Sequence, residues 1–88
     1  FIRIFFHNYQ NFVTMEHQLL TQLLSFREKQ ILKHIASGKP SKQIANDLQI
    51  SKNTVDTHRR NMIQKTNAQN TTELVERAYL EGLFKRLL

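Results

Sequence analysis

The sequence predicts an all-α domain, and two observations lead to that class. The chain of 88 residues contains only two glycines and one proline, and the alternating apolar pattern of strands is sparse. Apolar residues recur instead at helical spacing, between polar segments that carry helix-capping residues. A chain of this length suits one domain with a modest core that its helices must share. We therefore expect a domain of four helices over 25–88, preceded by an N-terminal helix over 1–24.

Residues 1–24 carry apolar residues at alternating spacings of three and four, as in an amphipathic helix or a coiled-coil seam, interrupted by Glu16. Two interpretations remain open: a helix packed on the core of its own domain, or a linker helix from an upstream domain that also helps to pair two chains. The opening FIRIFF also fits the end of a strand of a preceding domain. Because the chain does not begin with Met, we expect a piece of a longer protein. The stripe consists of Ile2, Phe5, Phe6, Tyr9, Phe12, Val13, Leu19, Leu20 and Leu23.

The next helix is predicted from Ser25 and Glu28, which have capping-box spacing, so that each side chain can bond the backbone amide of the other residue. It should end near Gly38, because glycine readily adopts the left-handed conformation that closes a helix. The residues expected on its inner face are Phe26, Ile31, Leu32 and Ile35.

Two further serines predict a closely spaced pair of helices. Ser41 can cap a short helix over 42–49, and Ser51 can cap a longer one over 52–65. Only residues 49–51 separate them, so they should meet at a steep angle. The short helix should bury Ile44, Ala45 and Leu48.

The last helix is predicted from Asn70, an N-cap residue with Glu73 three positions later. It should extend to Phe84, with an apolar surface wide enough for both a core and a partner. That surface consists of Leu74, Val75, Ala78, Tyr79, Leu80, Leu83 and Phe84.

The net charge of +6 is concentrated in the middle of the chain. Residues 25–70 hold nine Lys and Arg against three Asp and Glu, and the segments on either side are neutral. Such a local surplus attracts a polyanion, although a basic surface also serves solubility alone.

The helix over 52–65 has a face that suits DNA. With Val55 inward, Met62 and Thr66 lie within about 20° of it on a helix of 3.6 residues per turn. The opposite face carries Asn53, Thr57, Arg60 and Gln64, whose groups match base edges in a major groove. A capped helix, a tight turn and a polar second helix make a helix-turn-helix. Phosphate contacts are assigned to Lys42, Ser51, Lys52, Thr54, Arg59, Asn61 and Lys65.

Several other classes are excluded or disfavoured. The sequence contains no Cys, and it contains no run of about 18 apolar residues, the length needed to span a bilayer. No nucleophile–base pair, glycine-rich phosphate loop or pair of carboxylates indicates catalysis, so we expect neither an enzyme nor a cofactor. The histidines lack partners at metal-ligand spacing and are interpreted as satisfied side chains, with His58 partly buried. They are His7, His17, His34 and His58.

An ordered set of motifs resembles the LuxR/FixJ/NarL/GerE-type DNA-binding domain over about residues 22–85. The set begins with Leu24-Ser25-x-Arg27-Glu28, Ile31-Leu32, Ala36 and Gly38. It continues with Ser41-Lys42-x-Ile44-Ala45-x-x-Leu48-x-Ile50-Ser51, Thr54-Val55-x-x-His58, Lys65 and Glu73-Leu74.

This resemblance implies four helices, of which the second and third form the helix-turn-helix. It implies base contacts by Asp56, Thr57 and Arg60. It also implies a cytoplasmic transcriptional regulator that pairs through its fourth helix on paired DNA half-sites, with RNA polymerase as a candidate partner. Relatives carry receiver domains, as in response regulators, or sensor domains, or neither. The residues placed at the homodimer contact are Thr72, Glu76, Tyr79 and Leu80.

Two departures and two alternatives remain. Asp56 is acidic where relatives often carry Lys or Arg, which leaves it to accept from a cytosine amino group or to orient Arg60. Thr66 replaces a usual Leu, so the end of its helix is expected to be less tightly packed. A sigma-factor region 4-like domain shares part of the motif, but the long last helix argues against it. A protein-interaction module is the other alternative.

Overall fold

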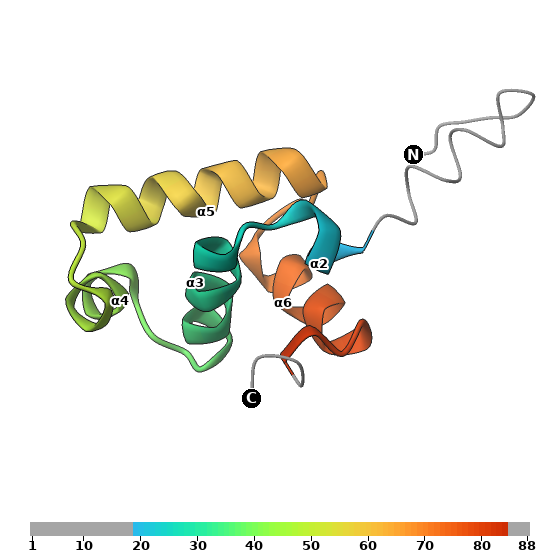
Figure 1. The fold of residues 1–88 in the computed structure, drawn as a ribbon, viewed down its shortest axis with the longest axis horizontal. Helices are drawn as coiled ribbons and strands as arrows, with labels where there is room; N and C mark the ends of the chain where they lie inside the picture. Colours follow the sequence, from blue (N-terminus) through green and yellow to red (C-terminus); the bar gives the residue numbers. More distant parts are fainter. Residues whose placement is uncertain (1–18, 85–88) are drawn as a thin grey trace, which may run out of the picture.

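The computed structural model describes residues 19–84, which form five α-helices and no strand (Figure 1). The predicted all-α class is confirmed for this part of the chain. The prediction for 1–24 lies mostly outside the described residues. The helices are α2 (Leu20–Leu23), α3 (Phe26–Ala36), α4 (Ser41–Leu48), α5 (Lys52–Thr66) and α6 (Thr71–Leu80).

The described end of the N-terminal stripe packs on the domain core. Leu19 is extended, α2 makes a single turn, and Leu20 and Leu24 are buried. The Leu20 amide donates to Glu81 Oε1 at 2.7 Å, so α2 is tied to the residue that follows α6. For these residues the structure agrees with packing on the chain's own core.

The predicted capping box of α3 is confirmed. Ser25 Oγ accepts from the Glu28 amide at 3.1 Å, and the Ser25 amide donates to Glu28 Oε1 at 2.8 Å. The helix ends at Ala36, and Gly38 has a φ of +87° as expected. The inner position predicted for Phe26 is wrong, since this residue is 69% exposed. At 100° per residue, Ile35 lies near the middle of the buried face of α3, and Phe26 lies on the opposite side of the helix.

The α4–turn–α5 unit has the predicted arrangement. Figure 1 shows α4 nearly end-on beside the start of α5, which runs across the view, so the two helices meet steeply. Gln49 closes α4 with a φ of 58°. The prediction that Ser41 caps α4 is wrong. Ser41 is the first helical residue, and the cap position is occupied by Pro40, whose side chain makes no cap hydrogen bond.

The core of the domain lies beneath α5. Val55 and Met62 are fully buried together with Ile31, Leu32 and Ile44, which come from α3 and α4. Ser51 caps α5 as predicted, by accepting from the Thr54 amide at 3.0 Å.

The end of α5 is closed despite a polar residue in its last turn. Thr66 is buried, and its hydroxyl donates to the Met62 carbonyl at 2.6 Å. Arg77 of α6 donates to the Thr66 carbonyl at 3.0 Å. The buried hydroxyl therefore finds its acceptor within its own helix.

The last helix is shorter than predicted. Asn70 caps it by accepting from the Glu73 amide at 2.8 Å, but α6 ends at Leu80 rather than at Phe84. Gly82 has a φ of +72° and turns the chain, so that Leu83 and Phe84 pack back into the core. A long fourth helix is therefore not an argument against the sigma-factor alternative.

Candidate nucleic-acid interface

The outward face of α5 is free of packing. Asn53, Thr57, Arg60 and Gln64 are all exposed, whereas Val55, Met62 and Thr66 hold the opposite face in the core. The predicted inner and outer faces of the helix are confirmed. Within the outward row, Arg60 Nη2 donates to Thr57 Oγ1 at 3.2 Å, so a guanidinium and a hydroxyl stand together on the surface.

Asp56 lies at the edge of this row and is bonded within the molecule. Its Oδ2 accepts from Lys52 Nζ at 2.8 Å, one helical turn away. The pKa of the Asp56 carboxyl lies below its usual value, chiefly because of the hydrogen bond from Lys52. The nearby Ser41 hydroxyl and the charges of Lys52 and Arg59 lower it further. Asp56 bonds Lys52 rather than orienting Arg60, so the second role suggested for it is not observed.

Most of the residues assigned to phosphate contact surround the start of α5. Ser51 Oγ and Thr54 Oγ1 are 2.8 Å apart at the first turn of α5. A helix N-terminus of this kind favours an anion. Arg59 is half-buried. The exposed members of the set are Lys42, Ser51, Lys52, Thr54, Asn61 and Lys65.

Lys65 differs from the others because its charge is paired with a buried carboxylate of another helix. Its Nζ lies 2.8 Å from Oε1 of Glu28, a carboxylate whose side chain is only 5% exposed. Burial alone would raise the pKa of Glu28, but the hydrogen bond and charge of Lys65 and the hydrogen bonds from Ser25 outweigh it and lower that pKa. Lys65 thus joins the last turn of α5 to the first turn of α3, a contact that the sequence prediction missed.

The residues placed at the dimer contact form an exposed surface on α6. Tyr79 is 63% exposed and Leu80 is 88% exposed. The Tyr79 ring packs edge-on against Phe84, with centroids 4.8 Å apart. Thr72 and Glu76 are exposed on the same helix.

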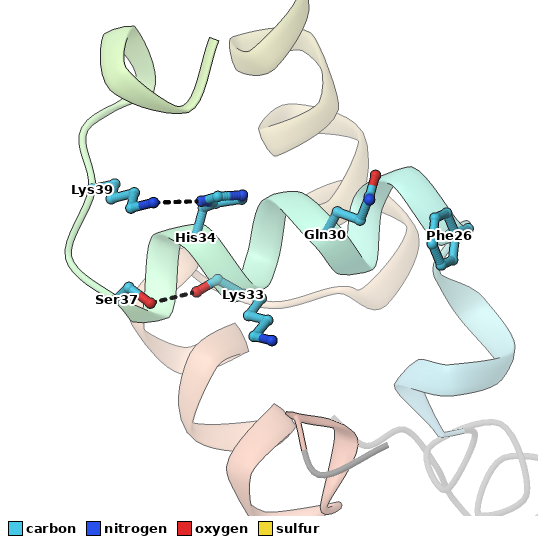
Figure 2. A pocket seen from close by; sticks show the side chains of 6 residues that line it. All are labelled: Phe26, Gln30, Lys33, His34, Ser37 and Lys39. Atoms are coloured by element: carbon cyan, nitrogen blue, oxygen red, sulfur yellow. Dashed lines mark hydrogen bonds between the residues drawn. The ribbon is translucent and has the colours of Figure 1, made fainter. Parts of the chain in front are cut away.

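A surface depression of about 370 Å³ lies on α3, on the side opposite its buried residues (Figure 2). Phe26, Gln30 and Lys33 line it from one face of the helix. At its other end, Lys39 Nζ lies 3.1 Å from His34 Nδ1 and 2.9 Å from Asp47. Burial and then the charge of Lys39 lower the pKa of His34. This depression lies apart from the outward row of α5.

The described histidines do not form a metal site. His34 has the partner expected of a satisfied side chain, whereas His58 is half-buried with an Nδ1 that makes no hydrogen bond, so the prediction for His58 is right in burial and wrong in pairing. His7 and His17 lie outside the described residues. Within residues 19–84, no cluster of three or more potential metal ligands occurs. No helix in the same range is long and apolar enough to cross a membrane.

Comparison with known proteins agrees with this geometry. The family model described as "Bacterial regulatory proteins, luxR family" matches residues 22–78, which is more than half of the chain. The chain belongs to this family, and it contains the family's helix-turn-helix DNA-binding domain of transcriptional regulators. The family resemblance inferred from the motifs is confirmed. The sigma-factor alternative is not favoured, because the relatives are regulators of the luxR type.

Three relatives illustrate the match. The uncharacterized response regulatory protein YgeK of Escherichia coli is 45% identical over 60 residues, 68% of this chain and 41% of that protein. The transcriptional regulatory protein FixJ of Rhizobium meliloti is 44% identical over 61 residues, 69% of this chain and 30% of that protein. The regulatory protein SdiA of Escherichia coli is 49% identical over 59 residues, 67% of this chain and 25% of that protein. The chain therefore matches less than half of each relative. No solved structure gives a significant match.

Proposed function

We propose that the chain binds specific sites in double-stranded DNA by inserting the outward face of α5 into the major groove. On this proposal the base contacts are made by Asn53, Asp56, Thr57, Arg60 and Gln64. The phosphate contacts come from Lys42, Ser51, Lys52, Thr54, Arg59 and Asn61, with Lys65 held by Glu28. The whole protein then regulates transcription in the cytoplasm, and RNA polymerase is a candidate partner there.

The observation that carries this proposal is the division of α5 into two faces. The helix is 15 residues long, yet only Val55, Met62 and Thr66 are buried. Its exposed row presents an amide, a hydroxyl, a guanidinium and a second amide, which are the groups that pair with base edges. A helix that served only the core would bury a larger share of its residues. The family membership supports the same use of this helix.

Replacement of Arg60 tests the proposal directly. Arg60→Ala should weaken binding to the preferred duplex by about 1–3 kcal/mol and relax the preference at one base pair, because a bidentate contact to guanine is lost. The matched control is Lys33→Ala, which removes one positive charge from the outer face of α3 (Figure 2). The preferred sequence comes from selection on random duplex DNA, and affinities from fluorescence anisotropy. Equal affinity and preference in the Arg60 variant and the wild type would exclude α5 as the reading helix.

Pairing of two chains through α6 is the second part of the proposal. The support is the exposed Leu80 beside Tyr79, an apolar surface that solvent does not favour. Leu80→Lys should abolish cooperative binding to paired half-sites while leaving binding to a single half-site intact. DNase footprints at rising protein concentration measure this. A wild-type footprint over one half-site without cooperativity would argue against the dimer.

A further inference from the structure

The pair formed by Lys52 and Asp56 bears on how the protein selects its DNA, and its role in selection rests on the proposed function. Asp56 is the one acidic residue of α5. Its carboxylate accepts from Lys52 Nζ at 2.8 Å. This donor belongs to the same helix, and the Asp56 side chain remains 32% exposed at the edge of the outward face of α5.

A carboxylate at this edge restricts which base can lie opposite it. The major-groove edges of guanine and thymine present acceptor atoms, which repel a carboxylate. Adenine presents an amino donor next to an acceptor nitrogen, whereas cytosine presents an amino donor with no acceptor beside it. Asp56 therefore fits cytosine best, and every other base leaves the carboxylate less well satisfied.

The same carboxylate also restrains a cation. The Lys52 side chain is 60% exposed in the first turn of α5, where it can reach a DNA phosphate. Moving Lys52 from Asp56 to a phosphate would leave the carboxylate without its cation, facing a polyanion. An amino group of cytosine can take the place of Lys52 as donor. The two events compensate each other, since the carboxylate keeps its hydrogen bonds and the ammonium gains a phosphate.

We propose that Asp56 is a specificity-determining residue that accepts from a cytosine amino group and thereby releases Lys52 to a DNA phosphate. Base recognition and one phosphate contact are then coupled. On a site without that cytosine, Lys52 stays on Asp56 and the protein makes one phosphate contact fewer.

The chain supplies a matched control for this coupling. Lys39 and Asp47 form a second exposed pair, with Nζ and Oδ2 2.9 Å apart and an Asp47 side chain that is 34% exposed. That pair lies beside His34 of α3, by the depression of Figure 2, rather than on α5. Asp47→Ala removes the same charge and the same kind of ion pair, away from the reading face.

The experiment measures the affinity of the full 88-residue chain for a set of duplexes across a range of salt concentration. One duplex is the preferred site found by selection, and the others replace its C·G pairs one at a time. For the wild type, one such replacement should lower affinity about tenfold. It should also reduce the slope of log affinity against log salt by about 0.9, the value for one phosphate contact.

The variants separate the two halves of the coupling. Asp56→Ala should lose both the cytosine preference and the slope difference, because it has no acceptor and leaves Lys52 free on every duplex. Lys52→Ala should keep the preference and lose the slope difference. Asp47→Ala should keep both.

Three results would overturn the inference. Retention of every base preference by Asp56→Ala would show that Asp56 does not read DNA. An unchanged slope difference in Lys52→Ala would show that Lys52 is not the released cation. Equal affinity of the wild type for all duplexes would refute the proposed function itself, and with it this inference, so the two failures are distinguishable.

Discussion

Two lysine–carboxylate pairs lie at opposite ends of α5. They have the same N–O distance but differ in burial and in the separation of their residues along the sequence. Lys65 with Glu28 and Lys52 with Asp56 both have N–O distances of 2.8 Å. The first joins residues 37 positions apart through a carboxylate that is 5% exposed, whereas the second joins residues four positions apart near the surface. A distance alone therefore does not tell what a pair does. Burial and separation in sequence assign the first pair to holding helices together, and they leave the second free to exchange partners.

The largest expected effect is a loss of folding stability when the pair of Lys65 and Glu28 is broken. Glu28→Ala removes the bond to the Ser25 amide and the carboxylate that Lys65 contacts. We expect a loss of about 2–3 kcal/mol in the free energy of unfolding, since a cap and a largely buried ion pair are lost together. Thermal unfolding followed by circular dichroism should show a midpoint lower by about 10–20 °C.

The control for this variant is Glu73→Ala, which alters the first turn of α6. Glu73 also bonds a backbone amide, that of Gln69, but it is exposed. Its replacement should cost about 0.5–1 kcal/mol. Equal losses in the two variants would mean that burial adds nothing to the bond between α3 and α5.

Replacing the two lysines should have smaller effects of different kinds, on stability for Lys65 and on DNA affinity for Lys52. Lys65→Met should lower the free energy of unfolding by about 1–2 kcal/mol, because Glu28 keeps its burial and loses its cation. Lys52→Met should leave the thermal midpoint unchanged and lower affinity for the preferred duplex, with a salt slope smaller by about one. Urea unfolding and anisotropy titrations on both variants measure this. A loss of stability in Lys52→Met would place the two pairs in the same class.

The smallest expected effect is on the dependence of folding stability on pH in the acid range. Because the folded state lowers the pKa of Glu28 below its ordinary value of 4.5, the stability contributed by this pair is complete above that pH. It is lost as pH falls through the lowered pKa. In that acid range, the wild type should therefore lose free energy of unfolding more steeply than Glu28→Gln does. Urea unfolding at successive pH values tests this, and parallel curves for the two proteins would contradict it.

Much of the fold was predictable because its signals are local. Ser25, Ser51 and Asn70 cap helices where their spacing predicts caps, and Gly38 closes a helix where it should. The two faces of α5 follow from a period of 3.6 residues applied to Val55. These features depend on residues within one or two turns of each other, which a sequence displays directly.

Two features of the fold depart from prediction although their signals are also local. The helical period that orders α5 also turns Phe26 away from Ile31 and Leu32, so its exposure was predictable from geometry. Gly82 carries the same helix-ending signal as Gly38, and it ends α6 early. Phe26 shows that the position of an apolar residue on its helix, rather than its type, decides its burial. Gly82 shows that apolar residues beyond a helix-ending glycine do not extend the helix.

Other features depend on tertiary contact and have no signal in the sequence. The bond between Lys65 and Glu28 and the bond between the Leu20 amide and Glu81 connect distant segments. Ser41 is of a residue type that predicts a cap, yet it is the first helical residue of α4, and Pro40 occupies the cap position. The pairing of Lys52 with Asp56 is the exception, since spacing of four residues on a helix allows such a pair.

The division of labour within α5 has a consequence for redesign. Asn53, Thr57, Arg60 and Gln64 are exposed, and the hydrogen bond between Arg60 and Thr57 joins two members of the row to each other. Folding therefore places little constraint on what these four positions contain, provided that they remain compatible with a helix. A library that varies them together should yield folded proteins in high proportion, each with its own preferred DNA sequence. If these residues read DNA as we propose, the scaffold can be retargeted without being rebuilt.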